Sequence, residues 1–203
     1  MKHKKRNIGV LGYLSIIAIL VGIVSCDNVS EQKRYRVIKV YDGDTVGFAN
    51  RAHVRLLGID CPEMVDNAKL NADARSMGQS KDFIKEQGRQ AFEFTHKLLM
   101  HEKVQVEFDK EKKDKYGRWL AYLWIELGNP GSSLKVDVPA YFVKVLRKDP
   151  HGKNKEYIFV NATIIKAGFA YPFATSDSLR YGDMLRQLYD QARAEKRGLW
   201  QAN

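Results

Sequence analysis

The chain has 203 residues, a hydrophobic fraction of 44% and a formal net charge of +10 at pH 7. That length is enough for one domain with a sizeable core. The sequence holds no internal repeat and no nucleotide-binding glycine loop, and it lacks the four closely spaced Cys or His residues of a structural zinc site. The basic charge favours a polyanionic partner such as nucleic acid or an anionic surface, although a solubilising surface charge would look the same.

The first 25 residues have the composition of a targeting segment. A basic start precedes the apolar run 8–24, which is long for a signal peptide and short for a membrane span. The run ends in Ile23-Val24-Ser25-Cys26, which resembles the lipobox of bacterial lipoproteins, where the cysteine becomes the lipidated first residue. An uncleaved signal anchor is the alternative. Both predict an exported protein, anchored on the outer side of the cytoplasmic membrane or in the cell envelope, or shed from it.

This interpretation divides the chain into a signal peptide at 1–25, a polar tether at 26–34 and a folded domain at 35–203. The only other cysteine is Cys61, so lipidation of Cys26 would leave it unpaired and would exclude a disulfide framework.

A β-hairpin is predicted between residues 42 and 63. The apolar residues Val46 and Phe48 lead into a polar turn at 49–52, and a second apolar run follows. With the turn near Arg51–Ala52, antiparallel pairing joins residues whose numbers sum to about 104, which places Asp44 opposite Asp60. Two carboxylates at such a short distance repel each other unless a cation lies between them. Asp oxygens are natural ligands of hard divalent ions. The hairpin therefore predicts a metal site.

Two more residues of this stretch suit phosphate chemistry. Glu63 follows Pro62, which forces the chain out of the strand, and reaches the same site without binding the metal directly. Arg55 offers a forked donor that matches phosphate. Metal, carboxylate and arginine together indicate phosphodiester hydrolysis. Regular alternation would point Arg55 and Asp60 to opposite faces, so we expect a bulge or kink at Gly58.

The remaining elements are predicted from periodicity and turn residues. Strands are expected at 35–41, 104–108 and 119–127, and helices at 80–100, 160–167 and 178–195. Gly88 weakens the first half of the helix at 80–100, whereas Gly168 fits the end of the next helix. Residues 64–79 are polar and predict a long loop, and residues 128–157 predict one or two inserted strands.

Three motifs occur in one order: Asp42-Gly-Asp-Thr45, Arg55-Leu-Leu-Gly-Ile-Asp-Cys-Pro-Glu63 and Asp114-Lys-Tyr-Gly-Arg118. Together they resemble the staphylococcal nuclease (thermonuclease) family, over roughly residues 35–200. The resemblance implies an α+β protein with an OB-fold five-stranded β-barrel and three helices. The stretch 128–157 would be an insertion, because compact members of the family have only a tight turn there.

The resemblance also implies a calcium-dependent endonuclease that cleaves DNA or RNA and leaves 3′-phosphates. Asp44, Asp60 and the main-chain carbonyl of Cys61 would hold the Ca²⁺ ion. The family has Thr at the position of Cys61, and a main-chain ligand tolerates that change. Calcium suits an irregular, carbonyl-containing shell better than magnesium does.

Five further residues receive roles from the resemblance. Glu63 would orient or deprotonate the attacking water. Arg55 and Arg118 would stabilise charge on the pentacoordinate phosphate. Lys115 and Tyr116 would lie near a nucleotide phosphate. The aromatic segment 169–173 either stacks on a base or packs in the core.

A catalytically silent nucleic-acid-binding module at the cell surface is the alternative function. The enzyme is favoured because every acidic and arginine residue of the expected site is present. We expect a monomer whose partners are its nucleic-acid substrate and, through the lipid, the membrane. The sequence does not distinguish a DNA substrate from an RNA substrate.

Overall fold

A computed structural model describes residues 33–132, 134, 138–149, 151–173 and 178–201. The predicted signal peptide, most of the tether and Cys26 lie outside the described residues. Within the described part of the chain, no helix combines the length and apolar character needed to cross a membrane.

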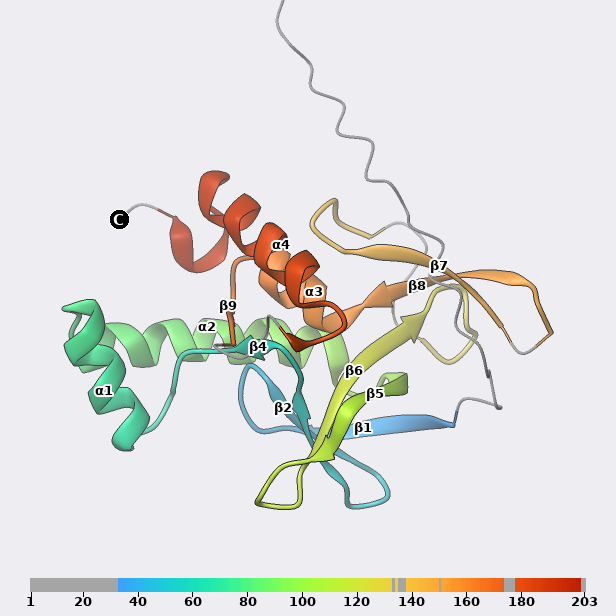
Figure 1. Cartoon of the computed structure of the whole chain (residues 1–203), viewed down its shortest axis with the longest axis horizontal. Helices are drawn as coiled ribbons and strands as arrows, with labels where there is room; N and C mark the ends of the chain where they lie inside the picture. Colours follow the sequence, from blue (N-terminus) through green and yellow to red (C-terminus); the bar gives the residue numbers. More distant parts are fainter. Residues whose placement is uncertain (1–32, 133, 135–137, 150, 174–177, 202–203) are drawn as a thin grey trace, which may run out of the picture.

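Five strands form a closed barrel (Figure 1). They are β1 (Arg34–Val40), β2 (Thr45–Phe48), β3 (His53–Leu56), β5 (Lys103–Lys113) and β6 (Trp119–Glu126). Their order is β3-β2-β1-β5-β6, and a parallel pairing of β3 with β6 closes the ring. Val37, Val46, Val54 and Leu123 are fully buried inside it. The predicted α+β fold with a five-stranded OB barrel is confirmed.

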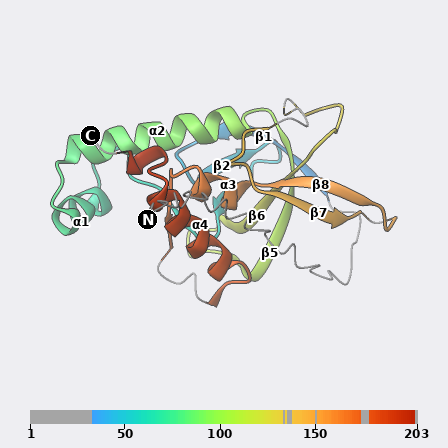
Figure 2. The ribbon, with the colours of Figure 1, turned by 90° about the horizontal axis from the view of Figure 1, so that it is seen from above.

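The predicted insertion extends the barrel wall as a hairpin. Strand β8 (Asn154–Phe159) pairs with the end of β6, and β7 (Lys144–Lys148) pairs with β8. Figures 1 and 2 show this hairpin projecting from one end of the molecule. Tyr157, Ile158 and Phe159 are buried, so the second half of β8 belongs to the main core.

The described residues contain four α-helices: α1 (Ala68–Met77), α2 (Lys81–Leu99), α3 (Val160–Lys166) and α4 (Gly182–Ala194). A short 3₁₀ turn, η2 (Gly198–Trp200), follows α4. Figure 2 shows α2 along one side of the molecule and α4 along the other. Ser80 caps α2 by accepting a 3.1 Å hydrogen bond from Phe83 N, and α2 runs unbroken through Gly88.

The prediction of a loop at 64–79, and hence of three helices, is wrong. Asn67 Oδ1 accepts a 2.7 Å hydrogen bond from Leu70 N, which caps the start of α1. Gly78 ends the helix with φ +64°, a conformation that glycine adopts without strain. Leu70 is fully buried, and α1 packs against α2 near its start. Two caps and one buried leucine therefore stabilise a helix whose other residues are mostly polar.

The predicted pairing of Asp44 with Asp60 is also wrong. Thr45 pairs with Arg55 and Gly47 with His53, so the hairpin turn lies earlier than expected. At that turn Arg51 adopts φ +66°. In this register Asp44 O accepts a 2.8 Å hydrogen bond from Leu56 N, at the end of β3.

Gly58 makes the expected kink. It adopts φ +80° between β3 and the short strand β4 (Ile59–Asp60). Strand β4 leaves the barrel and pairs with β9 (Tyr171–Pro172). This turn brings Asp60 back toward Arg55, although a continuous strand would have separated their side chains.

Candidate active site

The turn at 42–44 is fixed by close packing around Gly43. A Cβ on Gly43 would lie 2.6 Å from Cys61 Sγ and 2.9 Å from Ala91 Cβ, so only glycine fits. Thr95 of α2 donates a 2.7 Å hydrogen bond to Gly43 O. Asp42 Oδ1 accepts a 2.9 Å hydrogen bond from the amide of residue 44. Helix α2 therefore holds the turn that presents the first carboxylates.

A buried asparagine fixes the second turn. Asn161 of α3 donates hydrogen bonds to Leu57 O at 2.9 Å and Ala121 O at 3.2 Å. Its Oδ1 accepts a 3.0 Å hydrogen bond from Leu123 N. These bonds tie the turn before Asp60 to strand β6. Sequence reasoning missed this role, and the available signal was an asparagine near the start of a short, mostly apolar helix.

Arg55 lies between the two predicted metal ligands. One of its terminal nitrogens contacts Asp44 Oδ1, and the other donates a 2.7 Å hydrogen bond to Asp60 Oδ1. Asp44 is buried, and its carboxylate accepts hydrogen bonds from Cys61 N at 2.7 Å and Thr45 Oγ1 at 3.1 Å. The structure thus brings Asp44, Asp60 and Arg55 together. The turns at 42–44 and at Gly58 do this, and not a direct strand pairing of Asp44 with Asp60.

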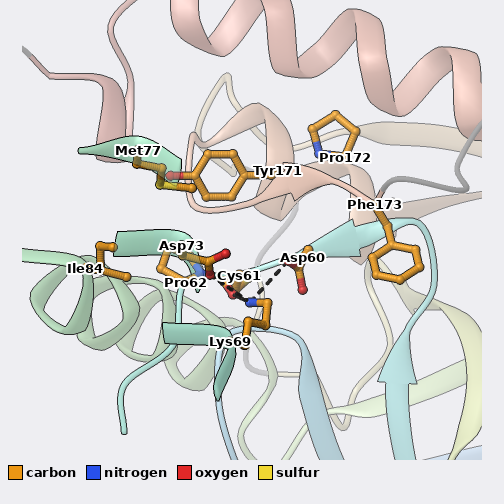
Figure 3. A pocket seen from close by; sticks show the side chains of 10 residues that line it. All are labelled: Asp60, Cys61, Pro62, Lys69, Asp73, Met77, Ile84, Tyr171, Pro172 and Phe173. Atoms are coloured by element: carbon orange, nitrogen blue, oxygen red, sulfur yellow. Dashed lines mark hydrogen bonds and ion pairs between the residues drawn. The ribbon is translucent and has the colours of Figure 1, made fainter. Parts of the chain in front are cut away.

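Helix α1 adds residues that the sequence did not predict. Lys69 Nζ lies 3.2 Å from Asp60 Oδ2 (Figure 3). It also lies 3.1 Å from Glu63 Oε1 and donates a 3.1 Å hydrogen bond to Cys61 O. Asn67 donates a 2.7 Å hydrogen bond to Glu63 Oε2. Burial would lower the pKa of Lys69, but Asp60 and Glu63 outweigh it and the pKa is raised. Both oxygens of Glu63 are thereby held, one by Lys69 of α1 and the other by the N-cap residue Asn67.

The turn at 114–118 forms a separate basic and aromatic group. Asp114 accepts hydrogen bonds from Tyr116 N at 2.9 Å and from Arg118 Nε at 2.6 Å. Tyr116 is 72% exposed, and Lys115 Nζ lies 5.0 Å from the centre of its ring. Arg118 immediately precedes the part of β6 that pairs with β3, the strand of Arg55. The turn therefore borders the carboxylate cluster.

The electrostatics connect Arg118 to that cluster. Burial raises the pKa of Asp42, and the charges of Arg55 and Arg118 oppose this rise. Both guanidinium groups thus act on the same carboxylate turn.

The predicted calcium ligands are all oxygen donors. Asp44, Asp60 and the Cys61 carbonyl supply only oxygen atoms, and these oxygens already attract Arg55 and Lys69. Across the described ranges, no three His, Cys, Asp or Glu side chains form a metal-binding group by themselves. The predicted set needs only two carboxylates and one main-chain carbonyl, so its donors fit a hard cation such as Ca²⁺.

The Cys61 thiol takes no part in this donor set. The side chain is 3% exposed, packs in the core and lies beside Gly43. Burial raises the pKa of the thiol, so it remains protonated. A cysteine at this position therefore affects packing, and its side chain does not block the main-chain carbonyl, which accepts a hydrogen bond from Lys69.

A cavity of about 310 Å³ opens beside Asp60 (Figure 3). Its walls include Met77 of α1, Ile84 of α2 and the aromatic residues Tyr171 and Phe173. Burial raises the pKa of Tyr171 to about 12. Of the segment 169–173, these two aromatic residues and Pro172 line the cavity.

Phe169 is different, because it stacks on Phe94 with 4.7 Å between ring centres. It belongs to the core and not to the cavity.

The family model described as staphylococcal nuclease homologue matches residues 53–202. This chain belongs to the staphylococcal nuclease family. It is similar to a thermonuclease of Staphylococcus hyicus, with 28% identity over 176 residues, 85% of this chain and 78% of the relative. A thermonuclease of Staphylococcus intermedius is 39% identical over 94 residues, 45% of this chain and 48% of the relative. The SPbeta prophage-derived endonuclease YokF of Bacillus subtilis is 26% identical over 170 residues, 81% of this chain and 43% of the relative.

Proposed function

We propose that this member of the family is a calcium-dependent endonuclease that hydrolyses phosphodiester bonds of DNA or RNA and leaves 3′-phosphates. Family membership and the names of the thermonuclease relatives support the reaction class. The observation that carries the proposal is the gathering of Asp44, Arg55 and Asp60, with Glu63 linked to the same cluster through Lys69.

Asp44, Asp60 and the Cys61 carbonyl would hold the Ca²⁺ ion. When bound, the ion supplies positive charge that polarises the phosphate and the attacking water. Glu63 orients or deprotonates this water. Its carboxylate suits the task because Asn67 fixes one of its oxygens and leaves the other to Lys69, a flexible side chain.

Arg55 and Arg118 stabilise the negative charge that develops on the phosphate. Arg55 pairs with Asp44 and Asp60, and Arg118 pairs with Asp114; these ion pairs beside the proposed site support the two roles. Lys115 and the exposed ring of Tyr116 contact a neighbouring phosphate. Tyr171 and Phe173 offer aromatic surfaces to a base in the adjoining cavity.

We also propose that the protein is exported and anchored to a membrane through a lipid on Cys26. The basis is the sequence of residues 1–26, which lies outside the described residues. A surface location would expose the enzyme to extracellular nucleic acid and calcium.

One assay tests the proposed activity. The protein is incubated with DNA and with RNA, in Ca²⁺ or in EGTA, and the product ends are determined. We expect cleavage that requires Ca²⁺ and leaves 3′-phosphates. Binding of both nucleic acids without cleavage would support the silent binding module, and full activity in EGTA would exclude the metal mechanism.

A further inference from the structure

The ammonium group of Lys69 lies among four oxygen atoms from four residues. Its Nζ is 3.1 Å from Glu63 Oε1 and from Cys61 O, 3.2 Å from Asp60 Oδ2 and 3.6 Å from Asp73 Oδ2. Figure 3 shows the side chain reaching toward Asp60 and Asp73 at the wall of the cavity. The side chain is only 35% exposed. Three carboxylates and a carbonyl around one cation are the oxygen types that a hard metal ion takes.

Two of these four oxygens belong to the proposed calcium set, those of Asp60 and Cys61. An ammonium group and a divalent ion at the same oxygens repel each other strongly, since like charges a few ångströms apart are poorly screened away from bulk water. Lys69 must therefore leave Asp60 and Cys61 before a metal ion can bind both.

The backbone of Lys69 is held on α1, whereas its side chain ends in rotatable bonds. Leu70 is fully buried, and Asp66, just before α1, pairs with Lys85 of α2 at 2.7 Å. Helix α1 is therefore anchored on α2 on both sides of Lys69. The lysine stem has four rotatable carbons, so the ammonium can change partners without moving the helix.

Asp73 is the second partner that such a movement needs. It lies at i+4 from Lys69, on the same face of α1, and already contacts the ammonium group at 3.6 Å. Asn67 bonds to Glu63 Oε2, whereas Lys69 contacts Oε1, so the two contacts use different oxygens of the carboxylate.

We propose that Lys69 is a tethered cation that occupies the metal-binding oxygens when calcium is absent and moves to Asp73 when calcium binds. It acts as a positioning residue, because it keeps Asp60 and Glu63 close together without metal. It also sets the calcium concentration at which the site fills. The inference rests on the calcium site of the proposed function, but it requires no cleavage.

Calcium affinity is the direct test. Isothermal titration calorimetry compares the full protein with Lys69→Met, Lys69→Arg and the control Lys85→Met. The control removes the same charge and breaks the ion pair that anchors α1. We expect Lys69→Met to bind Ca²⁺ about tenfold more tightly. Lys69→Arg and Lys85→Met should stay within about twofold of the unmodified protein. An unchanged or weaker affinity of Lys69→Met would overturn the proposal, as would the absence of calcium binding in every variant.

Thermal unfolding separates this role from a purely structural one. In EGTA, Lys69→Met should melt below the unmodified protein, because Asp60, Glu63 and Asp73 then repel one another without a cation. Saturating Ca²⁺ should remove most of that difference. An equal difference in EGTA and in Ca²⁺ would mean that Lys69 only supports the fold.

A double-mutant cycle tests the part of Asp73. Asp73→Asn should weaken Ca²⁺ binding when Lys69 is present and should have little effect in Lys69→Met. The same weakening in both backgrounds would show that Asp73 does not act through Lys69. If the variants show the expected calcium affinities but none of them cleaves nucleic acid, the result would support Lys69 as a tethered cation. The same result would contradict the proposed nuclease activity.

Discussion

Gly88 marks the point where helix α2 touches the backbone that carries Glu63. A Cβ at this position would lie 2.7 Å from the carbonyl carbon and oxygen of Glu63 and 2.8 Å from Pro62 O. A glycine inside a helix costs about 1 kcal/mol relative to alanine. The close contact explains why α2 accepts this cost, and why a residue that weakened the helix prediction lies inside the helix.

Gly88→Ala should therefore destabilise the protein, although the higher helix propensity of alanine alone would stabilise α2. We expect a loss of about 1–3 kcal/mol in the free energy of unfolding, because the backbone at 62–63 must move. Turnover should also fall, because Glu63 moves with its backbone. Urea unfolding and nuclease assays measure both, with the exposed Lys97→Ala in the same helix as the control. A more stable Gly88→Ala variant would show that the contact does not constrain the site.

At the residue scale, the sequence predicted which groups gather but not how they do so. Asp44, Arg55 and Asp60 come together as expected, yet the ladder that was to pair the two carboxylates has another register. Lys69 and Asn161 were not predicted. Their roles depend on the packing of α1 and α3 against distant turns, which no local pattern encodes.

Among the α-helices of the described residues, α1 is the one that periodicity failed to predict. Leu70 is its one buried residue, so it lacks the apolar stripe of an amphipathic helix. The caps Asn67 and Gly78 were the usable signal. The barrel strands and α2 were predicted because their burial follows the strand and helix periods.

The inserted hairpin should be dispensable for folding. Deleting 130–155 and closing the gap with a short turn leaves the buried end of β8 paired with β6. The deletion removes Arg147, which lies 4.0 Å from the Trp124 ring and pairs with Glu107 at 3.0 Å. We therefore expect cooperative thermal unfolding at a lower temperature, followed by circular dichroism.

Arg147→Ala alone should reproduce part of this loss, which makes it the matched comparison for the deletion. A deletion variant without a cooperative transition would show that the hairpin is needed to complete the core.

For the whole molecule, the sequence predicts attachment to a membrane. This prediction rests only on residues 1–26, which precede the described domain. If Cys26 carries the lipid, Cys26→Ser should release the protein from membranes or block its processing. Detergent partitioning and the mass of the mature chain measure this. A variant with unchanged partitioning and mass would favour an uncleaved signal anchor.

The most direct test of the calcium site and its division of labour is a calcium titration of nuclease activity in two variants. Asp44→Asn removes a proposed metal ligand, so raising the Ca²⁺ concentration should partly restore its activity. Glu63→Gln removes the group that acts on water, so its turnover should stay about 10²–10⁴-fold below normal at every Ca²⁺ concentration. Restoration of Glu63→Gln by excess Ca²⁺, together with an Asp44→Asn variant that does not respond to Ca²⁺, would contradict these roles.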